Sequence, residues 1–345
     1  MMGDMGCRPG ESGKILMKKA RQTVLELDVD NGKQGGVEAS DYIDHGKMAD
    51  RIDPIRLHQI EVSPIPAVNV ASVPQRSPLR YPGGKTWLIP HIRAWLETFS
   101  GGPPLLLEPF AGGGIVSLTA VMEHLVDRCL MVELDRDVAA FWHAALRHGD
   151  ALAEKVLCFT PTREAVNQLM ERPPDSVVEH GFRTLVLNRT RRGGILAPGA
   201  SFSRAGENGR GLASRWYPET IARRLGEITK HANRITFCEA DGMQLLAALL
   251  GERGEGIVLF VDPPYTAGGK RAGKRLYAHN DIDHLRLFQV LAESSADFLM
   301  TYDLSYEVVT LVREYGFHAV QVTMKNTHHA RVPELVVTAR PVFNT

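Results

Sequence analysis

The sequence has few cysteines and no long apolar run. Its four cysteines, Cys7, Cys129, Cys158 and Cys238, lie far apart and form no C-x-x-C pair. Neither a zinc site nor a disulfide framework is therefore indicated, and we expect buried, reduced thiols. No apolar stretch reaches the roughly 18 residues that a membrane-spanning helix needs, and the first residues lack the apolar segment of a secretory signal. We expect a cytoplasmic protein with no membrane partner and no metal.

The sequence also lacks an excess of either charge. Its 40 Lys and Arg residues balance 40 Asp and Glu residues, so the chain as a whole gives no electrostatic signal for nucleic acid or membrane. A balanced total still allows a local basic patch. Among the 13 scattered histidines only His328 and His329 are adjacent, and neighbours in a strand point to opposite faces, so a joint metal site is not indicated there.

A phosphate-binding P-loop is missing too, although one stretch resembles the end of such a loop. The stretch "LRYPGGKTW", residues 79–87, contains Gly84, Lys85 and Thr86 in the P-loop order. A P-loop also needs a glycine five positions before Gly84, so that backbone N–H groups can surround the phosphates. Leu79 stands at that position. The spacing excludes a P-loop ATPase or GTPase.

The hydrophobic pattern divides the chain into two unlike parts. Residues 1–75 are polar, glycine-bearing and rich in proline toward their end, which predicts a flexible or peripheral N-terminal extension. From Leu79 onward, strand and helix patterns alternate, which predicts an α/β fold with a largely parallel sheet. We expect strands at 104–110, 128–135, 234–241, 256–265, 297–303 and 317–324. Residues 155–232, which include an irregular segment rich in glycine and arginine, are predicted to form an inserted lobe.

A glycine turn follows the first expected strand, in "EPFAGGGIVSL", residues 108–118. Glycines between a buried strand and a helix let a ligand approach the backbone at the helix N-terminus. The dinucleotide fingerprint G-x-G-x-x-G is not met, because its third glycine would fall where Val116 or Ser117 stands. The next strand ends at Glu133, where an acidic side chain typically binds ribose hydroxyls in a Rossmann-like sheet. The pattern indicates a ribose-bearing cofactor.

The most informative stretch is "FVDPPYTAGG", residues 260–269. A hydrophobic strand ends at Asp262, and Pro263 and Pro264 impose a rigid, extended turn that presents Tyr265 beyond the sheet. An amino group on an aromatic ring is a poor nucleophile, because its lone pair is delocalised. A carboxylate and a backbone carbonyl that accept its two hydrogens would direct that lone pair outward, while an aromatic side chain stacks on the ring. The stretch therefore predicts a site that acts on such an amine.

Taken together and in this order, the motifs resemble those of the D12-class, Dam-like DNA adenine N6-methyltransferases. The matching elements are Tyr81–Lys85, Glu108–Gly114, Glu133 and Asp262–Tyr265, and the resemblance covers about residues 78–340. Two positions depart from common members, which often have tryptophan in place of Tyr81 and aspartate in place of Glu133. Both substitutions keep the chemistry.

The resemblance implies roles for individual residues. It implies S-adenosyl-L-methionine as the cofactor, bound by Tyr81, Lys85, Glu108, Phe110, Gly112, Gly114, Glu133, Asp241 and Asp262. Asp241 could equally serve as the N-cap of the helix that follows it. It implies a catalytic set of Asp262, Pro263, Pro264 and Tyr265, and no metal.

The insert provides the expected nucleic-acid contact. Residues 187–228 contain eight arginines against three glutamates, a composition that suits phosphates and base edges; the alternative is a solvated loop. The DNA-binding residues implied by the resemblance are Asn188, Arg189, Arg191, Arg192 and Arg204. We interpret Arg223 and Arg224 as ordinary surface charges on a helix. The stretch "TMKNTHHARVPELVVT", residues 323–338, resembles the hairpin that walls the family's target-base pocket.

The expected fold is thus a Rossmann-like class I methyltransferase sheet, residues 76–154 and 233–345, with residues 155–232 inserted for DNA target recognition. The expected reaction is methyl transfer from S-adenosylmethionine to adenine N6 in a specific double-stranded DNA sequence, with the base flipped out of the helix. We expect a monomer, and a paired restriction endonuclease is left open. Three alternatives also stay open: methylation of cytosine N4, methylation of RNA adenine, and a non-catalytic DNA-binding relic.

Overall fold

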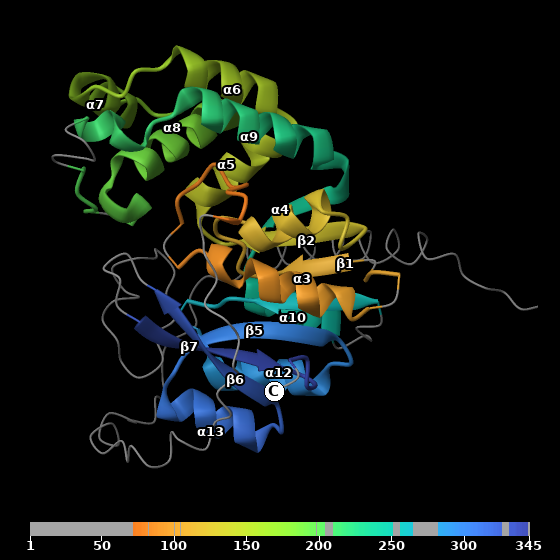
Figure 1. The fold of residues 1–345 in the computed structure, drawn as a ribbon. Coiled ribbons are helices and arrows are strands. Elements are labelled where there is room, and N and C mark those ends of the chain that lie inside the picture. The colour runs from red at the N-terminus through yellow and green to blue at the C-terminus, as the bar shows by residue number, and fades with distance from the viewer. Residues whose placement is uncertain are drawn as a thin grey trace, which may run out of the picture.

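The computed structural model describes residues 72–81, 83–99, 101–103, 105–197, 199–203, 210–250, 256–264, 282–325 and 331–343. Seven strands form one sheet in this part of the chain (Figure 1). They are β1 (Leu105–Glu108), β2 (Arg128–Glu133), β3 (Ile235–Glu239), β4 (Ile257–Val261), β5 (Asp297–Asp303), β6 (His318–Lys325) and β7 (Arg331–Thr338).

The strand order is β3-β2-β1-β4-β5-β7-β6. Strands β1 to β5 pair in parallel, whereas β7 lies antiparallel between β5 and β6. From β1 the chain builds the sheet in one direction through β2 and β3, and it then crosses back to place β4 on the other side of β1. Open α/β sheets bind ligands at such a reversal of strand order. The predicted fold class is confirmed: an α/β fold with a mixed, Rossmann-like sheet.

Helices cover both faces of the sheet. Strand side chains alternate between two hydrophobic clusters: Leu106 belongs to the first, whereas Leu105 and Leu107 belong to the second. The first face is covered by α3 (Ile89–Glu97), α4 (Ile115–Met122) and α5 (Arg136–Arg147). The second face is covered by α10 (Gly242–Leu250), α12 (His284–Glu293) and α13 (Tyr306–Glu314). The expected sheet and its flanking helices follow from the apolar patterns of these segments.

Four helices between α5 and β3 form a helical lobe, which we define as residues 149–231 (Figure 1). They are α6 (Gly149–Cys158), α7 (Arg163–Glu171), α8 (Val177–Thr190) and α9 (Pro218–His231), with short 3-10 turns at Arg192–Gly194 and Gly211–Arg215. Helix α8 packs along α5, and α9 packs on α6. The first hydrophobic cluster runs without a break from the sheet into this lobe. The predicted boundary at residue 155 falls inside α6.

Some sequence-based expectations need comment. The thiols of Cys129 and Cys238 are buried as expected, but Cys158, at the end of α6, is exposed. Within the described ranges, no group of three or more His, Cys, Asp or Glu side chains is placed to hold a metal ion. None of the helices that the structure describes combines the length and apolar character needed to cross a bilayer.

Candidate active site

Three acidic residues lie where parallel strands end at one edge of the sheet. Glu108 is the last residue of β1, Glu133 is the last residue of β2, and Asp262 directly follows β4. The strands β2, β1 and β4 are neighbours, and their carboxyl ends therefore bring these side chains to the same edge. The expected positions of all three acids are confirmed, and they lie at the crevice where open α/β sheets bind ligands.

The glycine turn between β1 and α4 is shaped by side chains of the chain itself. Gly112 and Gly114 have positive φ angles, 47° and 62°, which favour glycine. A Cβ atom on Gly112 would lie 2.5 Å from the ring of Tyr81, and one on Gly114 would lie 2.5 Å from Met131. The Trp142 indole also donates a hydrogen bond of 2.9 Å to the Gly112 carbonyl. The turn thus seats the predicted cofactor residue Tyr81 directly on the glycine backbone.

The Glu133 carboxylate braces this turn. One oxygen accepts a bond of 2.9 Å from the Gly112 N–H, and the other accepts bonds of 2.9 Å from Leu134 and Asp135 N–H groups. A carboxylate has about four acceptor positions, so capacity for a further donor is left. Burial raises the pKa of Glu133 to about 7. The residue therefore holds the turn in place and also occupies the position expected for a ribose ligand.

Glu108, the last residue of β1, carries a buried carboxyl group that reaches the first turn of α4. It accepts bonds from the backbone N–H of Ser117, at 3.1 Å, and from the Ser117 hydroxyl. Burial raises the pKa of Glu108 to about 8, since the Ser117 bonds only partly offset the loss of water. Asp262 and Glu133 add repulsion in the same direction. Near neutral pH the Glu108 carboxyl group is therefore mostly protonated, and it can donate a hydrogen bond.

Lys85 lies at the centre of the site. Its side chain is only 3% exposed, and its ammonium group lies 2.8 Å from Asp262 Oδ1 and 3.3 Å from Glu334 Oε1. It also donates a bond of 2.8 Å to the Gly83 carbonyl. The buried ammonium group is thus surrounded by two carboxylates and a backbone carbonyl. The geometry places Lys85 beside the predicted catalytic carboxylate, and contact with a cofactor stays a prediction.

Two residues of the site were missed from the sequence, Glu334 and Thr301. The Thr301 hydroxyl, on β5, donates a bond of 2.7 Å to Asp262 Oδ1. Glu334, on β7, is 2% exposed and pairs in register with Asp303, the last residue of β5. Because β7 is antiparallel, its early residues lie at the carboxyl edge of the other strands. The sequence signals for Glu334 were its place in residues 323–338, which resemble the family's last hairpin, and an acidic residue beside the apolar run "LVVT".

The stretch before Lys85 forms a tight turn. The Gly84 N–H donates a bond of 3.1 Å to the Tyr81 carbonyl, and Gly83 has a φ of 75°. A turn with positive φ at its third position requires glycine there. The glycines of "YPGGK" therefore serve to bring Lys85 back toward the sheet edge, where it meets Asp262.

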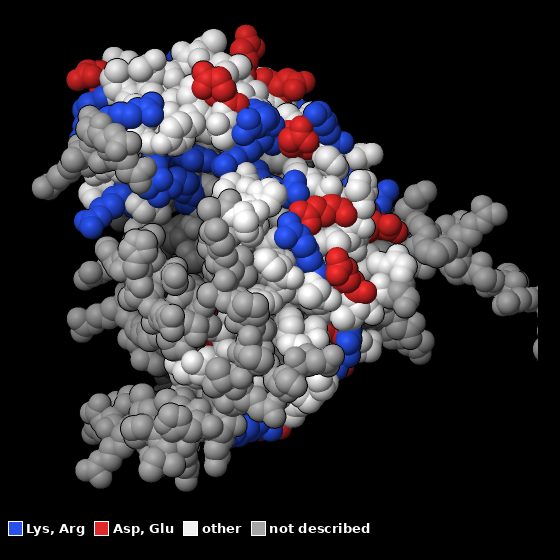
Figure 2. Space-filling model, in the orientation of Figure 1, with Lys and Arg blue, Asp and Glu red and all other residues white. Residues whose placement is uncertain are grey.

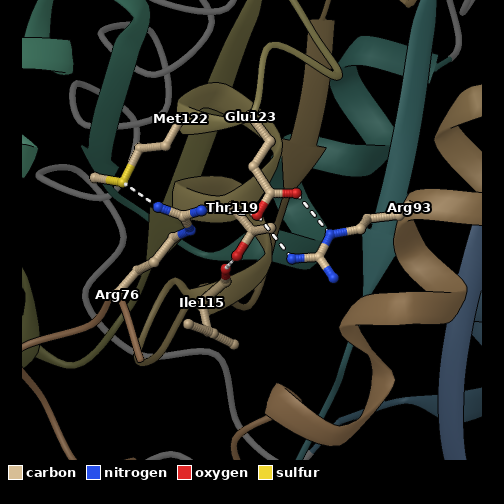
Figure 3. Close-up of polar contacts among 6 residues, drawn as sticks. All are labelled: Arg76, Arg93, Ile115, Thr119, Met122 and Glu123. Atoms are coloured by element: carbon tan, nitrogen blue, oxygen red, sulfur yellow. Dashed lines mark hydrogen bonds and ion pairs between the residues drawn. The ribbon is translucent and has the colours of Figure 1, made fainter. Parts of the chain in front are cut away.

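The segment that leads into this turn, residues 73–80, is fixed along its length. Val73 lies in the hydrophobic core. Arg76 and Arg93 approach the Glu123 carboxylate from different elements (Figure 3): Arg76 donates a bond of 2.7 Å, and Arg93 donates two, of 2.6 and 2.8 Å. These bonds hold the pKa of Glu123 below its usual range. Residues 73–76, at the edge of the predicted extension, are thus part of the packed body.

Asn188 and Arg189 are not placed as DNA-binding residues. Asn188 is fully buried at the end of α8; its amide accepts a bond of 2.7 Å from Arg80 N–H and donates to the carbonyls of Arg80 and Gly194, at 3.0 and 2.8 Å. The buried Arg189 guanidinium donates two bonds to the Pro78 carbonyl. These hydrogen bonds of Asn188 and Arg189 hold residues 78–80 against the lobe. We call this group of contacts the clasp.

Two further residues complete the clasp. Arg224 on α9 is half-buried and donates a bond of 2.8 Å to the Ser77 carbonyl, so it is not the ordinary surface charge predicted. Gly194 has a φ of 76°, and a Cβ atom there would lie 2.1 Å from the Arg80 carbonyl oxygen. Asn188, Arg189 and Gly194 therefore all contact the chain just before Tyr81.

The arginines of the lobe gather on one side. Figure 2 shows Lys and Arg in a band along the side of the lobe that faces the sheet, with acidic side chains on the opposite side. Burial lowers the pKa of Arg189 to about 9, and repulsion from Arg224, Arg80 and Arg215 adds to it. Of the other predicted DNA-binding residues, Arg192 is exposed, Arg191 donates a bond of 2.8 Å to the Leu196 carbonyl, and Arg204 lies outside the described residues.

The remaining predicted site residues lie around the same edge. Asp241 is the N-cap of α10: its carboxylate accepts bonds of 2.8 and 3.1 Å from Met243 and Gln244 N–H groups. Phe110 is partly buried against the second hydrophobic cluster. Pro263 is buried and Pro264 is half-buried. Tyr265 lies outside the described residues.

Comparison with known proteins gives no family. No family model matches the chain, and no curated protein matches it. One similar solved structure is a proposed RNA methyltransferase from Pyrococcus horikoshii: 11% identity, TM-score 0.33, covering 82% of this chain and 93% of that chain. Another is the rRNA methyltransferase AviRa from Streptomyces viridochromogenes: 18% identity, TM-score 0.36, covering 86% of this chain and 97% of that chain. At these TM-scores the likenesses say nothing about the reaction of this chain.

Proposed function

We propose that this protein is an S-adenosylmethionine-dependent methyltransferase that acts on the N6 amine of adenine in double-stranded DNA. One observation carries the proposal: Asp262, at the start of the Asp-Pro-Pro turn, is held at the ligand-binding edge of the sheet by Lys85 and Thr301. A carboxylate fixed in this way, next to a proline whose carbonyl can point into the site, suits an exocyclic amine.

The residues present fit the proposed cofactor. S-adenosylmethionine carries a ribose and a cationic sulfonium, and when bound it supplies an electrophilic methyl group. Glu133 lies at the end of β2, the usual position for an acid that binds ribose hydroxyls. Glu108 and Asp262 place further carboxyl oxygens nearby, and Asp241 lies beside the turn, since a Cβ on Gly242 would be 2.1 Å from the Pro109 carbonyl oxygen. Carboxyl oxygens accept hydrogen bonds from ribose hydroxyls and, where ionised, attract a sulfonium, whereas they repel a phosphate.

The Asp262 carboxylate and the Pro263 carbonyl accept the two hydrogens of the target amine in this proposal. The Lys85 ammonium pairs with Asp262 Oδ1 and the Thr301 hydroxyl donates to the same oxygen, so this oxygen is held in place before the substrate arrives. Preorganised acceptors of this kind lower the barrier because they need no rearrangement during the reaction. Tyr265 stacks on the flipped base.

The nucleic-acid partner is supported by the basic side of the lobe (Figure 2). Arg192 and Arg210 of the lobe are exposed, and Arg210 lies over the Tyr217 ring, 5.5 Å from its centroid. Exposed arginines beside an aromatic ring suit phosphates and bases. The clasp side chains are engaged in hydrogen bonds within the protein, so we assign the DNA contacts to the exposed arginines instead.

Transfer of labelled methyl groups from S-adenosylmethionine to unmethylated duplex DNA tests this function. The wild-type chain should label the DNA, whereas Asp262→Ala should abolish transfer while the chain still folds. Glu293→Gln, at the exposed end of α12, is a matched control and should keep full activity. Retained turnover in Asp262→Ala, or an inert wild-type chain on every DNA tested, would refute the proposal.

A further inference from the structure

A lysine between two carboxylates stands at the centre of the proposed site, and the sequence motifs account for only one of the two. Lys85 and Asp262 belong to recognised motifs. Glu334 lies in the stretch that resembles the family's last hairpin, but that resemblance assigns it no role; it lies 3.3 Å from the Lys85 ammonium, and both side chains are 3% exposed. A buried carboxylate costs free energy unless its partners compensate, so its presence here points to a use.

The geometry explains what Glu334 does to Lys85. The Lys85 ammonium donates to Gly83 O and forms ion pairs with Asp262 Oδ1 and Glu334 Oε1. The first acceptor belongs to the turn that carries Lys85, and the second is the carboxylate that Lys85 positions. Glu334 is the third, and it comes from a different strand of the rigid sheet, β7. It therefore fixes the direction from which Lys85 approaches Asp262.

We propose that Glu334 is a positioning residue, which holds Lys85 against Asp262 and thereby orients the carboxylate that receives the target amine. The proposal rests on the proposed function, because it assigns Glu334 a part in the same reaction. Glu334 acts through Lys85 and does not contact the reacting atoms.

Glu334→Gln tests the proposal, because it keeps the shape of the side chain and removes its charge. We expect kcat to fall about ten- to hundredfold, since small displacements of reacting groups have effects of this size. The dissociation constant for S-adenosylmethionine, measured by calorimetry, should change less than about threefold. Glu293→Gln should leave both quantities unchanged. An equal loss in cofactor affinity would instead assign Glu334 to cofactor binding.

A double-mutant cycle separates action through Lys85 from direct action. Lys85→Met removes the ammonium group, so Glu334→Gln should lower kcat by less than about twofold in that background. If Glu334 acts on the substrate itself, the full loss will persist and the proposal fails. Should Lys85→Met not fold, Thr301→Val gives a second cycle. Thr301 donates to the Asp262 oxygen with which Lys85 forms its ion pair, so the effects of Thr301→Val and Glu334→Gln on kcat must be non-additive.

One readout does not depend on turnover. Urea unfolding gives the factor by which Glu334→Gln changes the unfolding equilibrium constant. This factor should be at least about fivefold smaller in the Lys85→Met background than in the wild-type chain. A wild-type chain that methylates no nucleic acid would refute the proposed function, and this coupling would still decide whether Glu334 holds Lys85. Normal kcat in Glu334→Gln, with an active wild-type chain, would overturn the positioning role alone.

Discussion

Replacing Asn188 by alanine distinguishes the DNA-binding role predicted from the sequence from the role in the clasp seen in the structure. A DNA-contacting asparagine would affect nucleic-acid affinity, whereas an asparagine of the clasp would affect the stability of the fold and the position of Lys85. The structure places the side chain in full burial, with hydrogen bonds to Arg80 N–H, the Arg80 carbonyl and the Gly194 carbonyl. Asn188→Ala leaves these three backbone groups without their partner.

The magnitude follows from the number of bonds lost. Each buried hydrogen bond contributes about 1 kcal/mol net, and an unsatisfied buried group costs about 1–3 kcal/mol. Because Arg80 is only half-buried, water can reach part of the group, so we expect Asn188→Ala to lose about 2–4 kcal/mol. Most domains have about 5–15 kcal/mol of stability, so the variant should still fold.

Urea unfolding and methyl transfer, measured on the same preparations, check this prediction. Asn188→Ala should unfold at lower urea and transfer methyl groups more slowly, while the folded protein keeps its DNA affinity. Arg192→Ala is the matched control: Arg192 is exposed, so stability should stay within about 0.5 kcal/mol and DNA affinity should fall. An Asn188→Ala chain of wild-type stability whose only defect is weak DNA binding would refute the clasp.

Other changes test separate parts of the structure. Gly194→Ala should destabilise the chain by about 2 kcal/mol or more, since its Cβ would lie 2.1 Å from Arg80 O; wild-type urea unfolding would contradict the clasp geometry. Burial raises the pKa of Glu108 to about 8 from 4.5, so the folded state binds this proton more tightly and stability should fall between these pH values. Glu108→Gln should flatten that decline in urea unfolding at pH 5 and pH 8, and an unchanged slope would contradict the assignment. Arg210→Ala should weaken DNA binding and reduce its salt dependence by about one counterion, whereas an unchanged salt slope would remove Arg210 from the interface.

The sheet could be predicted from the sequence because its strands carry local signals. Apolar runs such as "LLLE" and "IVLFV" end in Glu108 and just before Asp262, and parallel strands bring their carboxyl ends together. These rules place three acids at one edge without any knowledge of packing. The order β3-β2-β1-β4-β5-β7-β6 was not predicted from the sequence, since periodicity does not fix which strands are neighbours.

The rest of the site depends on contacts between distant segments. Asn188 meets Arg80 across 108 residues of sequence, and no local pattern distinguishes an arginine that faces solvent from one that donates to a buried carbonyl. Glu334 reaches Lys85 only because β7 runs antiparallel to β5. The insert is rich in arginine, but its composition does not distinguish the arginines of the clasp from those that are exposed to solvent.

The identity of the methylated nucleoside tests the central claim most directly. Wild-type protein would be incubated with labelled S-adenosylmethionine and an equal mixture of unmethylated duplex DNA and RNA, and the digested nucleosides separated by mass. We predict label in N6-methyldeoxyadenosine, and none with Asp262→Ala. Label confined to RNA, label in N4-methyldeoxycytidine, or no label in any nucleoside would contradict the account.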